Sequence, residues 1–233
     1  MSGIIKTWSY SAFKQWSSCP RKYAYERLDK LKPPPSPAAE RGVKIHLLAE
    51  NVVRGKITGM PKNLDKFKDE FRALASTPGV LPEQDWALTR DWKPTSWRAK
   101  NVWLRGKCDV HLYDPEDNHL HIIDHKTGRM YPDHKGQGEL YASMGLGFYP
   151  ELEYVTVEFW YLDQGSLGDS PFEYTRSQVT KLKRRWVQRG ETMMKEKDFE
   201  ARPSKQSCRF CPFRSDKQLA NGEPGPCELW KKT

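Results

Sequence analysis

The sequence contains no long hydrophobic run. No stretch approaches the roughly eighteen consecutive apolar residues that a membrane-spanning helix requires. The first residues also lack the apolar segment of a secretory signal peptide. We therefore expect no membrane-spanning segment and no membrane partner. The expected location is the cytoplasm of a bacterial, archaeal or virus-infected host cell.

Cysteines are few, at five in 233 residues. In a reducing cytoplasm they are poor candidates for disulfide bonds. Ligation of a metal ion or a metal cluster is the better use for them.

Acidic residues are outnumbered by basic ones. The chain has 30 Asp and Glu against 39 Lys and Arg, which gives a formal net charge of +9. This excess favours a polyanionic partner, with nucleic acid ahead of an anionic membrane surface. Charge alone leaves open a soluble protein that is merely basic. Hydrophobic residues make up 37% of the chain, and nine Trp and ten Tyr add large apolar areas, so one full domain can bury a core.

The pattern of apolar residues predicts a mixture of helices and strands. Helices are expected at 9–29, with a break at Cys19-Pro20, and at 39–54, 63–76, 136–148 and 177–197. Strands are expected at 102–113, 119–127, 153–162 and 171–175, and a turn at 114–118 joins the first two. A stiff Pro-rich connector occupies 33–37, and residues 201–233 are too rich in Pro, Gly and Cys to form a core alone.

For two of these elements, the sequence also predicts which residues share a face. In the strand at 102–113, alternation separates an apolar face from a polar face. The apolar face comprises Val102, Leu104, Gly106, Cys108, Val110 and Leu112, and the polar face comprises Trp103, Arg105, Lys107, Asp109, His111 and Tyr113. In the helix at 39–54, the predicted buried stripe comprises Val43, Leu47 and Leu48.

Two carboxylates and a lysine fall on the two strands of the predicted hairpin. Lys126 follows Asp124 by two residues, so both side chains point to the same face of their strand. Asp124 comes after Ile122-Ile123 on a strand that should be largely buried, where an unpaired carboxylate is unfavourable. A metal ion would stabilise it, and so would a plain ion pair with Lys126. Asp109 in isolation is typical of a solvated strand carboxylate, but the pair beside a lysine suits a divalent metal ion, an activated water and a phosphate.

Two predicted helices add polar pairs at four-residue spacing, which places each pair on one helical face. The first pair is His46 and Glu50. His46 could give a nitrogen ligand to a metal ion, although a lone helical histidine is more often a surface or packing residue. The second pair is Gln137 and Tyr141. These side chains could hold a nucleic-acid backbone through an amide and a hydroxyl group, and the alternative is an ordinary amphipathic helix.

The ordered set of these residues resembles the RecB-like branch of the PD-(D/E)xK nuclease superfamily. The matching elements, in order, are Arg41-Gly42 with His46, Gly106-x-x-Asp109, Asp124-His125-Lys126 and Gln137-x-x-x-Tyr141. Ser9-Tyr10-Ser11 and Cys19-Pro20-x-x-Tyr23 are also similar to this branch. The last core carboxylate is Asp124 where many members carry Glu, and both side chains offer oxygen ligands to hard cations.

The resemblance implies an α/β fold with a restriction-endonuclease-like core, in which helices flank a mixed central sheet. It implies a single nuclease domain over residues 1–233. Its expected parts are an N-terminal helical segment (1–38), a catalytic core (39–200) and a cysteine-rich C-terminal segment (201–233).

The resemblance also implies roles for the site residues. The ligands of Mg²⁺ or Mn²⁺ would be His46, Asp109, Asp124 and the backbone carbonyl of His125. Lys126 would orient or activate the attacking water and stabilise charge on the phosphate. The residues that position the nucleic-acid strand would be Gln137 and Tyr141, with Glu50 as a weaker, supporting candidate.

Four of the cysteines form a second candidate site. Cys208-x-x-Cys211 and Cys227 lie near the C-terminus, and Cys19 lies far upstream beside a proline. By count, four thiolates fit a [4Fe–4S] cluster and a tetrahedral Zn²⁺ equally well. Iron–sulfur members of the RecB-like branch, including CRISPR-associated adaptation nucleases and bacterial end-processing nucleases, place one cysteine before the core and three after it. The similar split here favours a [4Fe–4S] cluster that joins the N-terminal helix to the C-terminal tail, with Zn²⁺ as the alternative.

The leading prediction is a Mg²⁺- or Mn²⁺-dependent deoxyribonuclease. It would act as an exonuclease on single-stranded DNA or on free DNA ends, in recombination, repair, or phage or CRISPR DNA processing. One alternative is a structure-specific endonuclease on the same core. Another is a zinc-containing nucleic-acid-binding module, against which the intact set of Asp109, Asp124 and Lys126 argues. The sequence shows no helicase motif, so a helicase or recombination partner would be a separate chain.

Overall fold

The computed structural model describes residues 5–131 and 134–232 of the chain. Contacts between Cα atoms divide the chain into two compact units. One unit comprises Met1–Pro37 with Arg189–Thr233, and the other comprises Ala38–Gln188. No described helix combines the length and apolar character needed to cross a bilayer.

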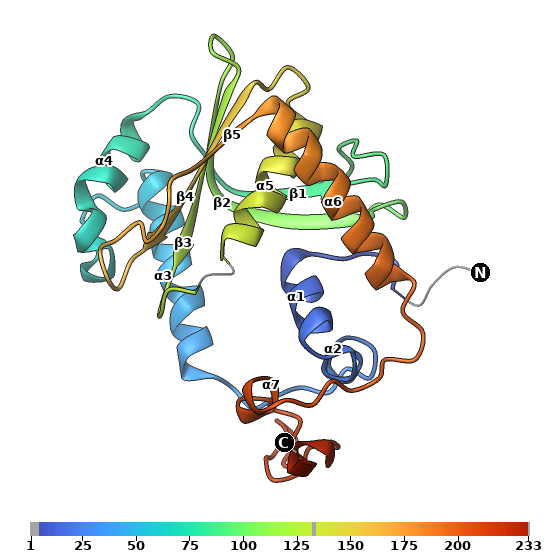
Figure 1. The fold of residues 1–233 in the computed structure, drawn as a ribbon. Helices are drawn as coiled ribbons and strands as arrows, with labels where there is room; N and C mark the ends of the chain where they lie inside the picture. The colour runs from blue at the N-terminus through green and yellow to red at the C-terminus, as the bar shows by residue number, and fades with distance from the viewer. Residues whose placement is uncertain (1–4, 132–133, 233) are drawn as a thin grey trace. The chain divides into compact units, whose positions relative to one another are not determined.

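The larger unit, Ala38–Gln188, is built on a mixed five-stranded sheet (Figure 1). Its strands are β1 (Leu81–Leu88), β2 (Leu104–Asp114), β3 (His119–Lys126), β4 (Tyr154–Tyr161) and β5 (Phe172–Thr175), adjacent in that order. Only the β3–β4 pair is parallel, with Asp124 opposite Phe159, and the other pairs are antiparallel. The helices are α3 (Pro37–Val53), the 3₁₀ helix η1 (Lys62–Phe67), α4 (Lys68–Ser76), α5 (His134–Phe148) and α6 (Arg176–Met194). This arrangement confirms the predicted α/β fold with a mixed sheet flanked by helices, and it is consistent with a restriction-endonuclease-like core.

Strand β1 is absent from the sequence prediction. It pairs with β2 from Leu81 opposite His111 to Leu88 opposite Leu104, at one edge of the sheet. Its sequence contains Pro82, and Glu83 has a positive φ of 52°. Both features weaken the local strand pattern, and an edge position tolerates them because only one side of the strand must form a ladder.

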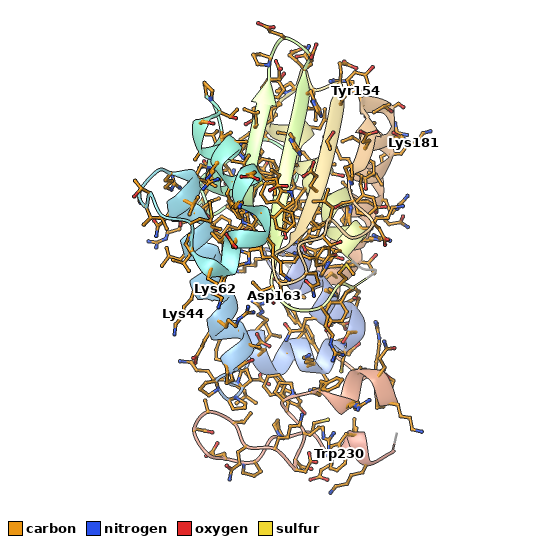
Figure 2. The ribbon with its side chains drawn as sticks, turned by 90° about the vertical axis from the view of Figure 1, so that its left-hand side faces the viewer. Lys44, Lys62, Tyr154, Asp163, Lys181 and Trp230 are labelled. Carbon is orange, nitrogen blue, oxygen red and sulfur yellow. The ribbon has the colours of Figure 1, made fainter. Side chains whose placement is uncertain are left out.

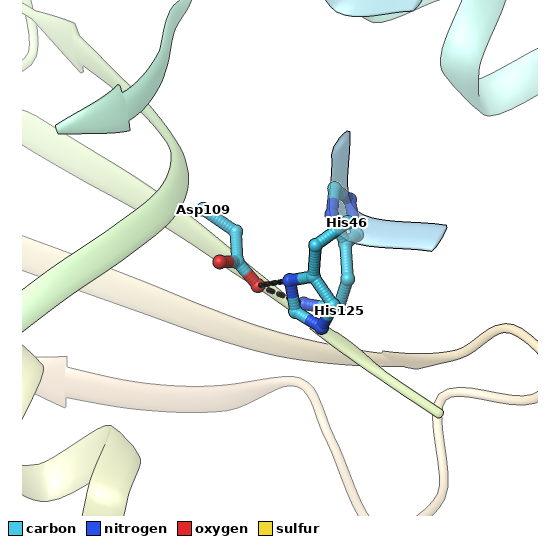
Figure 3. A group of neighbouring side chains, drawn as sticks. All are labelled: His46, Asp109 and His125. Carbon is cyan, nitrogen blue, oxygen red and sulfur yellow. Dashed lines mark hydrogen bonds and ion pairs between the residues drawn. The ribbon is translucent and has the colours of Figure 1, made fainter. Parts of the chain in front are cut away.

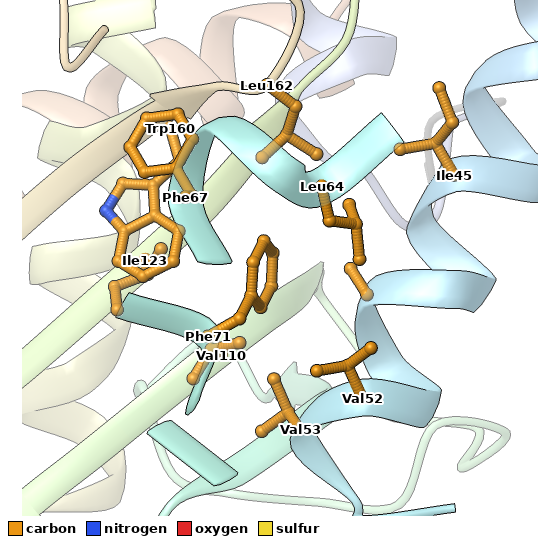
Figure 4. Close-up of a cluster of buried hydrophobic side chains, with 11 residues drawn as sticks. Ile45, Val52, Val53, Leu64, Phe67, Phe71, Val110, Ile123, Trp160 and Leu162 are labelled. Atoms are coloured by element: carbon orange, nitrogen blue, oxygen red, sulfur yellow. The ribbon is translucent and has the colours of Figure 1, made fainter. Parts of the chain in front are cut away.

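One face of the sheet is covered by α3, η1 and α4 (Figure 4). Their apolar side chains form a core cluster with one residue from each of three strands, Val110, Ile123 and Trp160. The α3 residues in this cluster are Ile45, Ala49, Val52 and Val53. The predicted α3 stripe is therefore wrong for Val43 and Leu47, which are 70% and 55% exposed, whereas Leu48 packs against the cluster. The predicted helix is present, but the face that packs against the sheet lies opposite Val43 and Leu47. Periodicity alone cannot decide which apolar face of a helix is buried.

The predicted alternation of β2 is also broken. Gly106 and His111 both face α5, because Gly106 approaches Met144 and His111 bonds Tyr149, whereas Val110 packs against α3 on the other face. Strict alternation would place Gly106 and Val110 together. His111 and Asp109, predicted on a polar face, are 2% and 9% exposed. The strand is thus covered on both sides, and Asp109 lies at the point where its side-chain pattern changes.

Helix α5 lies on the opposite face of the sheet from α3 and α4 (Figure 1). Two glycines permit its close approach. A Cβ atom on Gly145 would lie 2.3 Å from Leu120 Cδ2 on β3, and one on Gly138 would lie 3.2 Å from Val157 Cγ1 on β4. Because both glycines lack side chains, the helix axis can pack close enough for its neighbouring polar residues to reach the ends of the strands.

The smaller unit combines the N-terminal helices α1 (Tyr10–Ser18) and α2 (Pro20–Arg27) with the C-terminal segment. Ser9 caps α1 by accepting a hydrogen bond from the Ala12 N–H at 3.3 Å. Cys19 ends α1 and precedes Pro20, so the predicted break is confirmed. The C-terminal segment contains α7 (Lys205–Arg209) and η2 (Leu229–Lys232), and its Phe213 is fully buried against the ring of Tyr25.

The close approach of α5 makes a prediction for Gly145. Gly145→Ala should lower the free energy of unfolding by about 1–3 kcal/mol, because Leu120 is fully buried and cannot move aside. This loss should appear although alanine favours a helix over glycine by roughly 1 kcal/mol. Gly59→Ala is the matched control, since its Cβ would meet no atom within 4 Å. Urea unfolding of both variants measures the difference, and equal stabilities would contradict the packing described for α5.

Candidate metal centre

Asp124 carries a buried negative charge at the end of β3. It is 3% exposed, and its Oδ2 atom lies 2.5 Å from Lys126 Nζ. The alternation of the strand brings these two side chains together on the face that α5 covers, as their spacing predicts. Lys126 is itself mostly buried, with 17% of its side chain exposed. Each group is therefore the main counter-charge of the other.

Gln137 and Tyr141 from α5 hold this pair in place. Gln137 Oε1 accepts a hydrogen bond from Lys126 Nζ at 2.8 Å, and Gln137 Nε2 donates to Asp124 Oδ1 at 2.9 Å. Gln137 Nε2 also donates to the Tyr141 hydroxyl at 3.0 Å, and this hydroxyl donates to the Lys107 carbonyl of β2 at 2.6 Å. Gln137 and Tyr141, four residues apart on α5, thus connect β3 to β2. In this structure the polar groups of both side chains form hydrogen bonds within the protein.

A second group of side chains meets at Asp109 (Figure 3). Asp109 Oδ2 lies 3.3 Å from His46 Nδ1 of α3, and it accepts a hydrogen bond from the backbone N–H of His125 at 2.8 Å. Potential ligand atoms of His46, Asp109 and His125 all lie within 4.8 Å of one another. Two imidazoles and a carboxylate form a mixed nitrogen and oxygen donor set that suits divalent transition metals.

His125 enters this group through its side chain, whereas the sequence prediction used its backbone carbonyl. Its imidazole is 2% exposed and packs between Phe71 and Trp160, with ring centroids at 5.2 and 5.7 Å. Its Nε2 atom is buried, with no hydrogen-bond partner within the part of the chain that the structure describes. The signal for this residue was present in the strand alternation. Since Asp124 and Lys126 face α5, the side chain between them must face the helix that carries His46.

The electrostatics of the two groups differ. Burial raises the pKa of Asp124 to about 6, against the opposing charge of Lys126 and with a further contribution from the negative Asp109. Burial also disfavours ionised Asp109, but the hydrogen bond and charge of His46 outweigh it and lower the pKa of Asp109. His46 has a raised pKa because Asp109 outweighs the effect of its burial.

The imidazole of His125 and the phenol of Tyr141 are held neutral. Burial lowers the pKa of His125 to about 4, so at neutral pH its ring keeps a lone pair that can bind a cation. Burial raises the pKa of Tyr141 well above its ordinary value, so its hydroxyl keeps its proton.

Asp124 lies outside the group of ligand atoms within 4.8 Å of one another. Its charge nevertheless contributes to the raised pKa of His46, and the charge of Asp109 contributes to that of Asp124. The two groups therefore interact electrostatically. Among the predicted site residues, the structure brings together His46 with Asp109 on one side and Asp124 with Lys126 on the other.

Two further motif residues have structural partners. Glu50 accepts a hydrogen bond from Arg54 at 2.8 Å, so its carboxylate is paired on its own helix. Arg41 binds the carboxylate of Asp163, whose Oδ2 atom also accepts the Gly128 N–H at 2.8 Å. Asp163 lies in the loop after β4 (Figure 2) and was not identified from the sequence, because no pattern marks a loop carboxylate. It connects the start of α3 to the chain that leaves β3.

The four predicted cluster cysteines line one pocket in the smaller unit. Cys19, Cys208, Cys211 and Cys227 all border it, and Tyr25 and Leu229 also contribute to its wall. No three of these thiols lie within 4.8 Å of one another in the described residues. Cys108 is fully buried in the sheet, as expected for a core residue.

Two glycines bring Cys227 back to this pocket. Gly222 has a positive φ of 84°, and a Cβ atom on Gly225 would lie 2.3 Å from the carbonyl oxygen of Arg214. The backbone of Cys227 can then pair with the segment after Cys211, where its N–H donates to the Phe213 carbonyl at 2.9 Å.

Comparison with known proteins places this geometry in context. The family model of the PD-(D/E)XK nuclease superfamily matches residues 7–215. The Gene 69 protein of Mycobacterium phage D29 is 38% identical over 77 residues, which are 33% of this chain and only 29% of that relative. A solved structure titled "Crystal structure of SSO0001" aligns with 89% of this chain and 84% of its own, at 17% identity and a TM-score of 0.45.

The raised pKa of Asp124 predicts a pH dependence of stability. An unfolded Asp ionises near pH 3.8, whereas folded Asp124 ionises near pH 6, so the folded state holds this proton more tightly. Its contribution to stability is therefore present below about pH 4 and is lost as the pH rises to about 6. The side chain of the Asp124→Asn variant does not ionise. In EDTA, the free energy of unfolding of the variant minus that of the wild type should therefore increase as the pH rises from 4 to 6, by roughly 3 kcal/mol at most.

Urea unfolding at a series of pH values measures this difference. A difference that stays constant, or that falls as the pH rises from 4 to 6, would show that the fold does not disfavour the carboxylate charge of Asp124.

Proposed function

The chain belongs to the PD-(D/E)XK nuclease superfamily, and on that premise we propose that it is a divalent-metal-dependent deoxyribonuclease. The observation that carries the proposal is the meeting of His46, Asp109 and His125 next to the buried pair of Asp124 and Lys126. A module that only bound DNA would require no such arrangement of ligand atoms and charges.

The residues that we propose for the metal ion are His46, Asp109 and His125, with Asp124 beside them. The donor set fits a cation, because the imidazole of His125 has a buried nitrogen with no hydrogen-bond partner among the described residues, and Asp109 is held in its ionised form. Mg²⁺ and Mn²⁺ are the expected ions, and the two imidazoles favour Mn²⁺. A bound cation would supply an activated water and neutralise charge on the phosphate.

Lys126 is the proposed catalytic cation of the chain itself. Its ammonium group is fixed by Asp124 and by Gln137 Oε1, so it needs no rearrangement to face developing negative charge on a phosphate. Gln137 and Tyr141 are proposed as positioning residues, since their polar groups hold Asp124, Lys126 and the β2 backbone together.

We propose exonuclease action on single-stranded DNA or on free DNA ends. The support is the likeness of the ordered motifs to the RecB-like branch, together with the net charge of +9, which favours a polyanionic substrate. A structure-specific endonuclease on the same core is the competing outcome of the test below. A helicase or recombination partner on another chain, and a place in recombination, repair, or phage or CRISPR DNA processing, remain part of this proposal.

We further propose that Cys19, Cys208, Cys211 and Cys227 ligate a [4Fe–4S] cluster. Support comes from the single pocket that the four cysteines border, and from its thiol donor set. One Zn²⁺ with Zn–S bonds of about 2.3 Å would draw all four sulfurs to about 4 Å of one another. No three of the thiols lie within 4.8 Å of one another in the described residues, so the metal content of the purified protein decides between the cluster and Zn²⁺.

The nuclease proposal is tested with Asp109→Asn and Lys126→Ala. Each variant should reduce Mn²⁺-dependent degradation of end-labelled DNA at least about a hundredfold, since each removes a charge that the reaction requires. Asp114→Asn is the matched control, because Asp114 is an exposed carboxylate at the far end of the same strand. Its activity should equal that of the wild type.

Two results would contradict this proposal. If both site variants still cleave DNA, Asp109 and Lys126 are not required for the reaction. If Asp114→Asn loses cleavage, the loss in the site variants reflects a general effect on the folded protein. Circular single-stranded DNA separates the two modes of cleavage. An exonuclease leaves it intact, and an endonuclease converts it to linear fragments.

The cluster proposal predicts the colour and metal content of the purified protein. Anaerobic purification should give a brown protein that absorbs near ~400 nm and contains about four iron atoms per chain. Cys19→Ala should lose the colour and lower the unfolding temperature, because metal ligation contributes folding free energy. A colourless wild-type protein with one equivalent of zinc would contradict the [4Fe–4S] proposal and support Zn²⁺ at the four cysteines.

A further inference from the structure

The C-terminal segment contains a second pocket, which shares Cys208 with the pocket that the four cysteines border. It has a volume of about 800 Å³ and lies where α7 and η2 face each other within the smaller unit. The side chains that matter are four cations, Lys205, Arg209, Arg214 and Lys231, and two aromatic rings, Phe210 and Trp230. Among the described residues, no carboxylate borders the pocket. We call it the basic aromatic pocket.

Phe210 is the most unusual residue of the pocket. Its side chain is 76% exposed, the highest value among the large hydrophobic residues that the structure describes as exposed. The guanidinium of Arg209 lies 5.1 Å from the centre of the Phe210 ring. The ring is therefore open to water beside a cation, and it offers a planar face on which an unpaired base can stack.

Trp230 supplies a second ring that is fixed in place. Arg214 lies over it at 4.0 Å from the ring centroid, and the indole N–H donates to Ser215 Oγ at 3.1 Å. Figure 2 shows Trp230 in the C-terminal segment, which carries the pocket. Fixed rings and cations together are the features by which proteins hold unpaired nucleotides.

The charges of the pocket favour a polyanion. Asp216 pairs with Arg214, and Glu228 pairs with Lys231, so these two cations are partly neutralised by carboxylates outside the pocket. Lys205 and Arg209 form no ion pair within residues 5–131 and 134–232. The pocket therefore presents uncompensated positive charge beside the exposed ring.

We propose that the basic aromatic pocket binds single-stranded DNA, with a base stacked on Phe210 and the flanking phosphates held by Lys205 and Arg209. A single strand is favoured because duplex bases are already stacked on one another and cannot cover the ring. The choice of DNA over RNA rests on the proposed function. The pocket lies outside the metal centre and holds a strand without cleaving it, so its loss affects substrate binding and not the bond-breaking step.

Fluorescence anisotropy with a labelled oligothymidine in EDTA tests this binding without cleavage. Phe210→Ala should weaken binding about tenfold or more, and Phe210→Trp should keep the wild-type affinity, because every base can stack on either ring. Arg209→Ala should weaken binding and reduce its salt dependence. Tyr154→Ala is the matched control, since Tyr154 is 57% exposed on β4 beside the acidic residues Asp117 and Glu173. Its affinity should be unchanged.

The proposal is overturned if Phe210→Ala binds as tightly as the wild type, or if it loses affinity for blunt duplex DNA to the same extent. It is also overturned if Tyr154→Ala loses as much as Phe210→Ala. If circular dichroism shows that Phe210→Ala is misfolded, Arg209→Ala and Phe210→Trp decide the question. A separate Mn²⁺ cleavage assay distinguishes this proposal from the nuclease proposal. If the wild type cleaves DNA but Phe210→Ala binds it normally, only the pocket proposal is refuted. If Phe210→Ala binds DNA more weakly but the wild type does not cleave it, only the nuclease proposal is refuted.

Discussion

The burial of a negative charge at Asp124 is the constraint on which the larger unit depends. A carboxylate with 3% exposure is stable only when its counter-charge and hydrogen bonds are fixed in place. Lys126 comes from the same strand, and Gln137 comes from α5, which must pack tightly to reach it. The absence of side chains on Gly138 and Gly145 permits that approach. The close packing of one helix therefore determines the charge arrangement of the site.

Much of this arrangement follows from local sequence rules. Strand alternation places Asp124 and Lys126 together, and helical spacing places Gln137 and Tyr141 on one face of α5. These relations were predictable because each depends on the geometry of a single element. The hairpin of β2 and β3 was also predictable, because two strand-like runs flank the turn at 114–118, although the alternation of β2 breaks at Asp109.

The features that escaped prediction depend on contacts between elements. The face of α3 that packs inward carries Ile45 and Ala49, and periodicity could not distinguish it from the face with Val43 and Leu47. The edge strand β1 has a weak pattern of its own and is defined by its pairing with β2. Strand alternation places the side chain of His125 on the face opposite Asp124, but its approach to His46 and Asp109 depends on how α3 packs on the sheet.

The chain carries two donor sets of different chemistry, and each lies within one unit. Nitrogen and oxygen donors meet at the end of the sheet, where a hard or borderline cation suits hydrolysis of a phosphodiester. Sulfur donors border a pocket in the smaller unit, where a soft metal site would stabilise a segment with few core residues.

The most direct test of the metal centre is a calorimetric titration of Mn²⁺ into the protein without DNA. We expect about one Mn²⁺ bound per chain in the wild type, and at least tenfold weaker binding when His125 is replaced by leucine or Asp109 by asparagine. Equal affinity and stoichiometry in the wild type and both variants would show that these side chains do not hold the metal ion.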